Sequence, residues 1–124
     1  MSINSRNVLE TYIGTVEANA SNGVSSSKQI RIQHNGMLVI YTKADMLIRQ
    51  YVTGSASISH NDTILWQNTK NSTGWYMINL FEGWKCFPVN KNDIITFKVT
   101  NEQANENGAG ATNSTISYYM VVFD

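Results

Sequence analysis

The stretch WKCFPVNKNDIITFKV, residues 84–99, contains the only proline and the only cysteine of the chain and one of its three tryptophans. Its second half alternates, because Ile95, Phe97 and Val99 are separated by a threonine and a lysine. This period of two is typical of a strand with one buried face. Pro88 comes just before a polar turn, where a strand can end without the ladder hydrogen bond that proline lacks. The stretch therefore predicts a strand, a polar turn and a second strand that enters the core.

Similar patterns recur along the chain. In QIRIQ, Ile30 and Ile32 fall on one face, and in RQYVTGSASIS the residues Val52, Gly54, Ala56 and Ile58 fall on one face. The stretches GMLVIYTKA and ISYYMVVF are apolar on both faces, which indicates strands covered on both sides. Polar segments rich in Asn, Asp, Ser and Gly separate these runs.

Residues 5–17 are ambiguous, since Leu9, Ile13 and Val16 have helical spacing. The Thr, Ile, Gly and Val content nevertheless favours a strand. The predicted strands are residues 8–17, 28–34, 37–44, 49–59, 63–68, 74–81, 93–101 and 115–123. About eight short strands at near-regular spacing predict an all-β fold, an antiparallel jelly-roll β-sandwich that forms a single domain over residues 1–124.

Charge and cysteine content exclude several classes of protein. Only 15% of the residues are charged and the formal net charge is zero, so no basic stripe for nucleic acid is present. No apolar run reaches the length of a membrane span, and the first ten residues lack the pattern of a secretory signal. We therefore expect no nucleic-acid partner, no membrane insertion and no signal peptide. Cys86 cannot form an internal disulfide, and we expect it to pack as a small apolar residue.

Amides and hydroxyls supply much of the polar character. The chain has 15 asparagines, 12 serines and 11 threonines. Such side chains suit hydrogen bonding to polar surfaces, sugars included. An AT-rich coding sequence would enrich asparagine regardless of function, so the composition alone leaves both explanations open.

No catalytic motif is recognisable, and we expect no catalytic residues, no metal and no cofactor. His34 and His60 fall in polar turns at predicted strand ends. With Asp45 or Asp62 they could bind zinc if the fold joined them, but lone turn histidines are more often surface residues.

Aromatic residues mark the best candidate binding site. Exposed aromatic rings stack on sugars or anchor protein interfaces, and the polar segment NTKNSTG lies directly before one tryptophan. The candidate ligand-binding residues are Asn68, Lys70, Asn71, Trp75 and Tyr76. Trp66 and Trp84 are expected to fill the core or a subunit interface instead.

The segment FPVNKNDIITFKVT resembles the hydrophobic-Pro-Val-x-Lys-Gly-Asp-x-Ile-x-Phe element of trimeric jelly-roll heads. These heads occur at the tips of bacteriophage tail fibres and in related receptor-binding proteins, and tumour-necrosis-factor-like and complement heads share a comparable element. Asn92 stands where the glycine would be, and asparagine also tolerates a left-handed backbone. Asp93 is expected to hydrogen-bond the amides of the turn.

The C-terminal segment TISYYMVVFD resembles the last strand of those heads, which runs through the middle of a sheet near the trimer axis. A strand without a polar face is easier to explain if a second subunit covers one side. The resemblance therefore implies a homotrimer, with an interface formed by Tyr118, Tyr119, Met120, Val121, Val122 and Phe123.

The sequence thus favours a non-enzymatic virion protein, assembled in the host cytoplasm, which acts as a fibre-tip or capsid-surface head. Its partners would be other virion proteins and a host surface glycan or protein. One alternative is a monomeric or dimeric carbohydrate-binding lectin module. Another is a purely structural decoration protein of the virion.

Overall fold

A computed structural model describes residues 7–20, 23–48, 52–72, 76–103 and 112–124. Within these ranges the chain is built from strands, and no helix there is long and apolar enough to cross a membrane. The strands are β1 (Val8–Ala20), β2 (Val24–Arg31), β3 (Gly36–Ile48), β4 (Val52–His60), β5 (Thr63–Ser72), β6 (Tyr76–Val89), β7 (Ile94–Gln103) and β8 (Thr112–Phe123).

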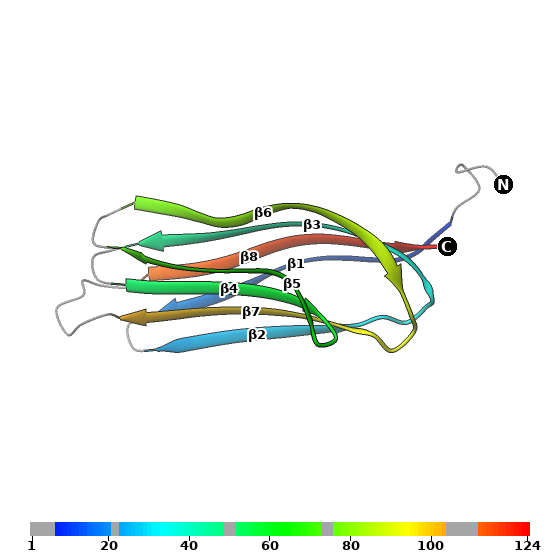
Figure 1. Cartoon of the computed structure of the whole chain (residues 1–124), viewed down its shortest axis with the longest axis horizontal. Helices are drawn as coiled ribbons and strands as arrows, with labels where there is room; N and C mark the ends of the chain where they lie inside the picture. The colour runs from blue at the N-terminus through cyan, green and yellow to red at the C-terminus, as the bar shows by residue number, and fades with distance from the viewer. Residues whose placement is uncertain (1–6, 21–22, 49–51, 73–75, 104–111) are drawn as a thin grey trace.

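The strands form two antiparallel four-stranded sheets that pack face to face (Figure 1). One sheet has the order β1-β8-β3-β6 and the other has the order β2-β7-β4-β5. Except at the β4–β5 hairpin, successive strands alternate between the sheets. This is the jelly-roll arrangement, which confirms the predicted fold. The last strand, β8, is internal to its sheet, as the resemblance implies.

Several strands are longer than the sequence predicts. β5 continues to Ser72 and β6 continues to Val89, so two segments predicted as loop or corner belong to strands. β2 begins at Val24 and ends at Arg31, earlier at both ends than predicted. Residues 5–17 were the ambiguous segment, and β1 there confirms the strand. The extensions have a common cause, because ladder pairing with a neighbour overrides weak local propensity.

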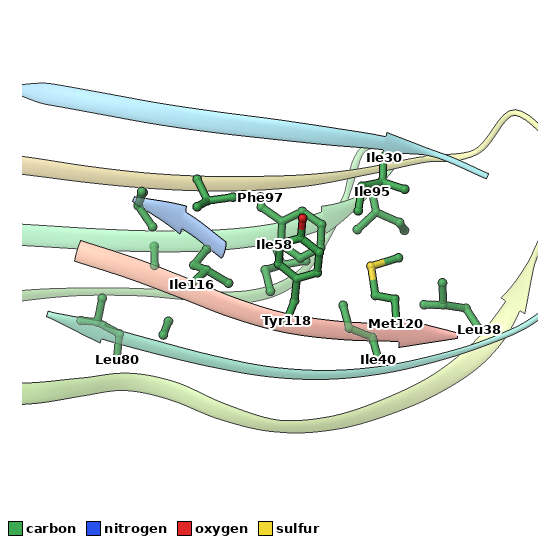
Figure 2. Close-up of a cluster of buried hydrophobic side chains, with 14 of the residues drawn as sticks. Ile30, Leu38, Ile40, Ile58, Leu80, Ile95, Phe97, Ile116, Tyr118 and Met120 are labelled. Atoms are coloured by element: carbon green, nitrogen blue, oxygen red, sulfur yellow. The ribbon is translucent and has the colours of Figure 1, made fainter. Parts of the chain in front are cut away.

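The core lies between the two sheets and is built by alternate residues. Ile95, Phe97 and Val99 of β7 are fully buried, as the opening stretch predicts. In β8 the even-numbered residues point inward, and Figure 2 shows Ile116, Tyr118 and Met120 among the side chains of the core. The Tyr118 ring stacks on Phe97, with centroids 4.1 Å apart. A Cβ at Gly14 would overlap the Tyr118 hydroxyl, so glycine is required there.

A buried polar cluster joins β1, β7 and β8. The side-chain amide of Asn101 donates to the carbonyls of Ala18 and Thr112, both at 2.9 Å. Its oxygen accepts a short hydrogen bond from the Ser114 hydroxyl. Asn101 and Ser114 are fully buried, and burial without partners would be costly. Asn101 is the last residue of the strand predicted over residues 93–101, and in the structure it is a buried residue of the longer β7.

The turn between β6 and β7 has the predicted geometry. Asn92 has a φ of 79°, in the left-handed region, which confirms that asparagine takes the role of the glycine here. Asp93 Oδ2 accepts a hydrogen bond from the Asn90 amide at 2.9 Å, which confirms its predicted contact with the turn. Pro88 belongs to the edge strand β6 and lies opposite Met37 of β3. An edge strand tolerates proline, which has no backbone N–H to donate.

Asp93 also connects this turn to the β4–β5 turn. Its carboxylate contacts His60 Nε2 at 2.8 Å and accepts from the Asn61 side chain at 3.2 Å. The backbone amide of Asn61 donates to the Ile94 carbonyl, and the side-chain oxygen of Asn61 accepts from the Ile94 amide. The hydrogen bond from the Asn90 amide, followed by those from His60 and Asn61, lowers the pKa of Asp93. His60 therefore pairs with Asp93, not with Asp45 or Asp62.

We expect Asn92→Ala to be less stable than Asn92→Gly by about 1 kcal/mol. Both substitutions remove the side-chain oxygen that accepts from the Arg31 guanidinium, and only alanine adds the strain of a positive φ. Urea unfolding of the two variants measures the difference. Equal stabilities would show that the left-handed conformation costs nothing at this position.

We expect Asp93→Ala to lower the free energy of unfolding by about 1–3 kcal/mol at neutral pH, because a turn amide and Asn61 lose their acceptor. Since the pKa of Asp93 is lower in the folded chain, the advantage of the wild type is complete above the unfolded value of 3.8. It is lost as the pH falls through the folded pKa. Urea unfolding across the acid range tests this, with the exposed Asp62→Ala as the control. A wild-type advantage that grows on acidification would contradict it.

Candidate functional site

The three described side chains of the predicted ligand-binding set do not all face the same way. Asn68, Lys70 and Asn71 lie in β5 and not in a loop, and successive residues of a strand point to opposite faces. Asn71 accepts from the Thr53 hydroxyl at 2.6 Å on the outer face, whereas Asn68 and Lys70 are on the other side of the strand.

Asn68 has a structural role at the open side of the sandwich. Its side-chain amide donates to the Leu80 carbonyl at 2.8 Å, and its oxygen accepts from the Thr69 amide at 2.9 Å. The first of these bonds joins edge strand β5 of one sheet to edge strand β6 of the other. Trp75 lies outside the described residues, and so does the side chain of Tyr76.

Trp66 closes the same side of the sandwich. Its ring stacks on Phe81 with centroids 6.2 Å apart, and Lys85 Nζ lies 5.0 Å from the ring centroid. The ring is partly buried against the core, which confirms its predicted role in packing. A sugar could not stack on the ring face that Phe81 covers.

The strongest feature of the surface is the outer face of the β1-β8-β3-β6 sheet. Six of the eight exposed large apolar side chains in the described residues belong to its strands. Ile13 is 73% exposed and Trp84 is 65% exposed, so of the two places predicted for Trp84, the core or a subunit interface, the structure excludes the core. Cys86 is exposed on this face, opposite Val39, and does not pack inside as predicted. The reason is register, since Trp84 and Cys86 alternate with the inward-directed residues of β6.

The cross-strand register brings these side chains into adjacent rows. Ile13, Tyr119, Tyr41 and Trp84 lie side by side across β1, β8, β3 and β6. We call the whole surface the apolar outer face: Ile13, Met37, Val39, Tyr41, Trp84, Cys86, Pro88, Tyr119, Val121 and Phe123. None of these residues is acidic or basic, and the charged side chains of Lys43 and Glu82 lie in the next outward row, at the border of the surface.

Two aromatic rings form the rigid centre of the apolar outer face. Tyr41 and Trp84 have ring centroids 4.9 Å apart with an interplanar angle of 49°. The Tyr41 hydroxyl donates to Glu82 at the border of the surface, and this hydrogen bond raises the pKa of Tyr41. The hydrogen bond thus connects the aromatic pair to the polar border of the apolar outer face.

Strand β8 contributes to the apolar outer face with only half of the predicted interface residues. Tyr118, Met120 and Val122 are at most 4% exposed and lie in the core, so they are not available to a second chain. Tyr119, Val121 and Phe123 point outward. The sequence could not divide the six residues, because both faces of this strand are apolar.

The outer face of the other sheet has the opposite character. It presents hydroxyls and amides with a single lysine at its centre, and a small depression of about 180 Å³ lies there. The side chains on this surface include Ser55, Ser57, Gln67, Thr69, Lys98 and Thr100. The two outer faces of the sandwich are therefore suited to different surroundings, one to another protein surface and one to water.

No protein-family model and no curated protein sequence matches the chain. Solved structures share its fold. The chain superposes on a protein chain of the T13 particle of infectious bursal disease virus with a TM-score of 0.56 and 10% identity, over 90% of this chain and 31% of the viral one. For the VP2 subviral particle of infectious bursal disease virus the TM-score is 0.50 with 11% identity, over 97% and 33%. The chain thus spans about a third of the length of these viral chains.

A weaker likeness, with a TM-score of 0.43 and 11% identity, is to Eiger TNF from S. frugiperda, over 89% of this chain and 91% of that one. At these identities the comparisons establish the jelly-roll fold and nothing further.

We expect Asn68→Ala to lower the free energy of unfolding by about 1–2 kcal/mol, and the matched Asn71→Ala to lower it by less than about 0.5 kcal/mol. Asn68 joins the two sheets, whereas Asn71 bonds only an exposed hydroxyl on its own sheet. Chemical denaturation of both variants is the measurement. Equal losses would show that the bond between β5 and β6 does not stabilise the sandwich.

Proposed function

We propose that this chain is a non-enzymatic adhesion head of a virus particle, which assembles as a homotrimer through the apolar outer face. It would lie at a bacteriophage fibre tip or on a capsid surface and bind a host surface glycan or protein. The observation that carries the proposal is the apolar outer face itself, a cluster of exposed and half-buried apolar side chains on one sheet, of which Ile13, Trp84 and Tyr119 are exposed.

The occupant that we propose for this surface is the same surface of two further copies. Around a threefold axis each interface joins different parts of this surface on neighbouring copies, and uncharged side chains there can be buried with no ion left unpaired. Clusters of exposed apolar side chains on soluble proteins commonly mark interaction sites. The resemblance to trimeric heads adds the threefold arrangement, because in those heads the last strand lies near the trimer axis. Here that strand is β8, which contributes Tyr119, Val121 and Phe123.

The place on a virus particle is supported by the fold that the chain shares with the chains of infectious bursal disease virus particles. The non-enzymatic character rests on the sequence, in which no catalytic motif is recognisable. A trimeric head would present three copies of each receptor site, and multivalency would raise avidity without new contacts.

We expect the chain to have a solution mass near 42 kDa, three times the 13.9 kDa of one chain. Ile13→Lys places a charge in the apolar outer face and should give single chains, since burying an unpaired charge is costly. Ile64→Lys is the matched control, because Ile64 is 58% exposed and belongs to β5 of the other sheet. Light scattering on a sizing column measures the mass. A wild-type chain that remains single at high concentration would refute the trimer and favour the lectin module.

The adhesion part requires a separate measurement. Fluorescently labelled trimer should bind bacterial cells or a surface glycan, and the Ile13→Lys single chain should bind about a hundredfold more weakly, which is the lower end of the gain from multivalency. Flow cytometry over a panel of bacteria is the readout. A trimer that binds no cell and no glycan, but binds assembled particles, would instead support the structural decoration protein.

A further inference from the structure

A groove runs along the side of the sandwich opposite to Trp66. It lies where β1 and β2, the edge strands of the two sheets, are adjacent but not paired, and its volume is about 520 Å³. The groove is shallow and widely open to solvent, so a ligand would lie along it and would not be enclosed. Its lining contains a single aromatic residue, Tyr12, together with Glu10, Gln29, Arg31 and Gln33. The lining residues come from two short segments, residues 10–12 and 29–33, and the strands β1 and β2 that carry them belong to different sheets.

Hydrogen bonds hold the base of the groove in place. The Tyr12 hydroxyl donates to Glu10 Oε2 at 2.7 Å and lies 3.3 Å from the Arg31 carbonyl. The same carboxylate oxygen accepts a hydrogen bond from the backbone amide of Gln33 at 3.2 Å. Burial, then the bond to Glu10, raises the pKa of Tyr12, so the hydroxyl keeps its proton throughout the neutral range. The tyrosine and the carboxylate are therefore arranged before any ligand arrives.

Other polar groups in the groove remain available. Within the described part of the chain, Gln29 makes no side-chain hydrogen bond, and Glu10 Oε1 accepts none. Arg31 donates from Nε and Nη2 to Asn92 Oδ1, at 3.2 and 2.8 Å, and these two hydrogen bonds do not use Nη1. The lining of the groove thus holds a carboxylate oxygen, a guanidinium nitrogen and an amide that have no internal partner among the described residues, beside Tyr12, whose half-buried ring packs against the core.

This set of groups matches the chemistry of a sugar. The C–H face of a pyranose packs on an aromatic ring, and its hydroxyls both donate to carboxylates and accept from guanidinium and amide groups. The one acidic and the one basic side chain of the lining balance each other, which favours a neutral ligand over a phosphate or an acidic sugar. A peptide would instead be expected to use apolar pockets, whereas Ile30 is the only aliphatic residue of the lining and is buried.

We propose that the groove between β1 and β2 binds a neutral sugar unit of a surface glycan. This deepens the proposed adhesion function and rests on it, since it names the receptor chemistry and the residues that would meet it. In the proposed homotrimer the groove would occur three times, which suits weak individual sites acting together.

The test begins with the wild-type chain on an array of neutral, sialylated and sulfated oligosaccharides. The neutral disaccharide with the strongest signal is then titrated into labelled protein and followed by NMR. We expect shifts at residues 10–12 and 29–33. Gln29→Ala should weaken binding about fivefold and Glu10→Gln about tenfold, in keeping with the loss of one or two hydrogen bonds. Gln67→Ala is the matched control and should bind normally. Gln67 is an exposed glutamine on β5, which is the edge strand opposite to β2 in the same sheet as Gln29.

Three outcomes would overturn the inference: no neutral sugar binds, only acidic glycans bind, or Gln29→Ala and Glu10→Gln bind as well as wild type. Because Gln29 makes no contact that the fold needs, its loss of affinity cannot be attributed to unfolding. The mass measurement is independent of the groove, and cell binding by the wild-type chain tests adhesion whichever surface carries it. A trimer that adheres to cells while the groove variants adhere equally well would refute the groove and leave the adhesion head standing.

Discussion

The double pairing of β8 is the constraint on which the rest of this structure depends. β8 is hydrogen-bonded to β1 on one side and to β3 on the other along most of its length. A strand held from both sides has one register, and a slip of a single residue would turn every side chain to the opposite face. The inward direction of Tyr118 and the outward direction of Tyr119 therefore follow from the same set of backbone bonds.

Two further features fix the ends of the sandwich. At one end, the Asn101 amide ties β1, β7 and β8 together inside the core, where water cannot compete for its hydrogen bonds. At the other end, Asp93 and Asn61 join the β6–β7 turn to the β4–β5 turn. At each end, polar side chains replace backbone pairing where the ladders end. They satisfy backbone and side-chain polar groups that would otherwise be left unpaired.

The fold presents distinct surfaces in different directions. The apolar outer face extends across all four strands of one sheet, whereas the groove lies between β1 and β2, where the two sheets come together. Ile13 and Tyr12 are neighbours in β1, but alternation directs Ile13 to the apolar outer face and Tyr12 toward the groove. One strand can thus serve assembly with one face and ligand binding with the other.

The sequence alone determined the features that depend on neighbouring residues. The period of two predicted the buried sets in β4 and β7, and asparagine at 92 predicted a left-handed turn, because alternation and turn conformation are local properties. The strand count and the spacing of the turns were enough for the jelly roll.

The tertiary structure decided everything that depends on pairing between distant strands. The segment from Asn68 to Ser72 has the composition of a loop, yet it is a strand because β4 lies beside it. Trp84 and Cys86 look like core residues in sequence, and only the β3–β6 register turns them outward. The groove was not foreseen at all, since it joins residues of β1 to residues of β2 that share no ladder. Such a site has no periodic signal, because the space between two sheet edges exists only once both sheets have formed.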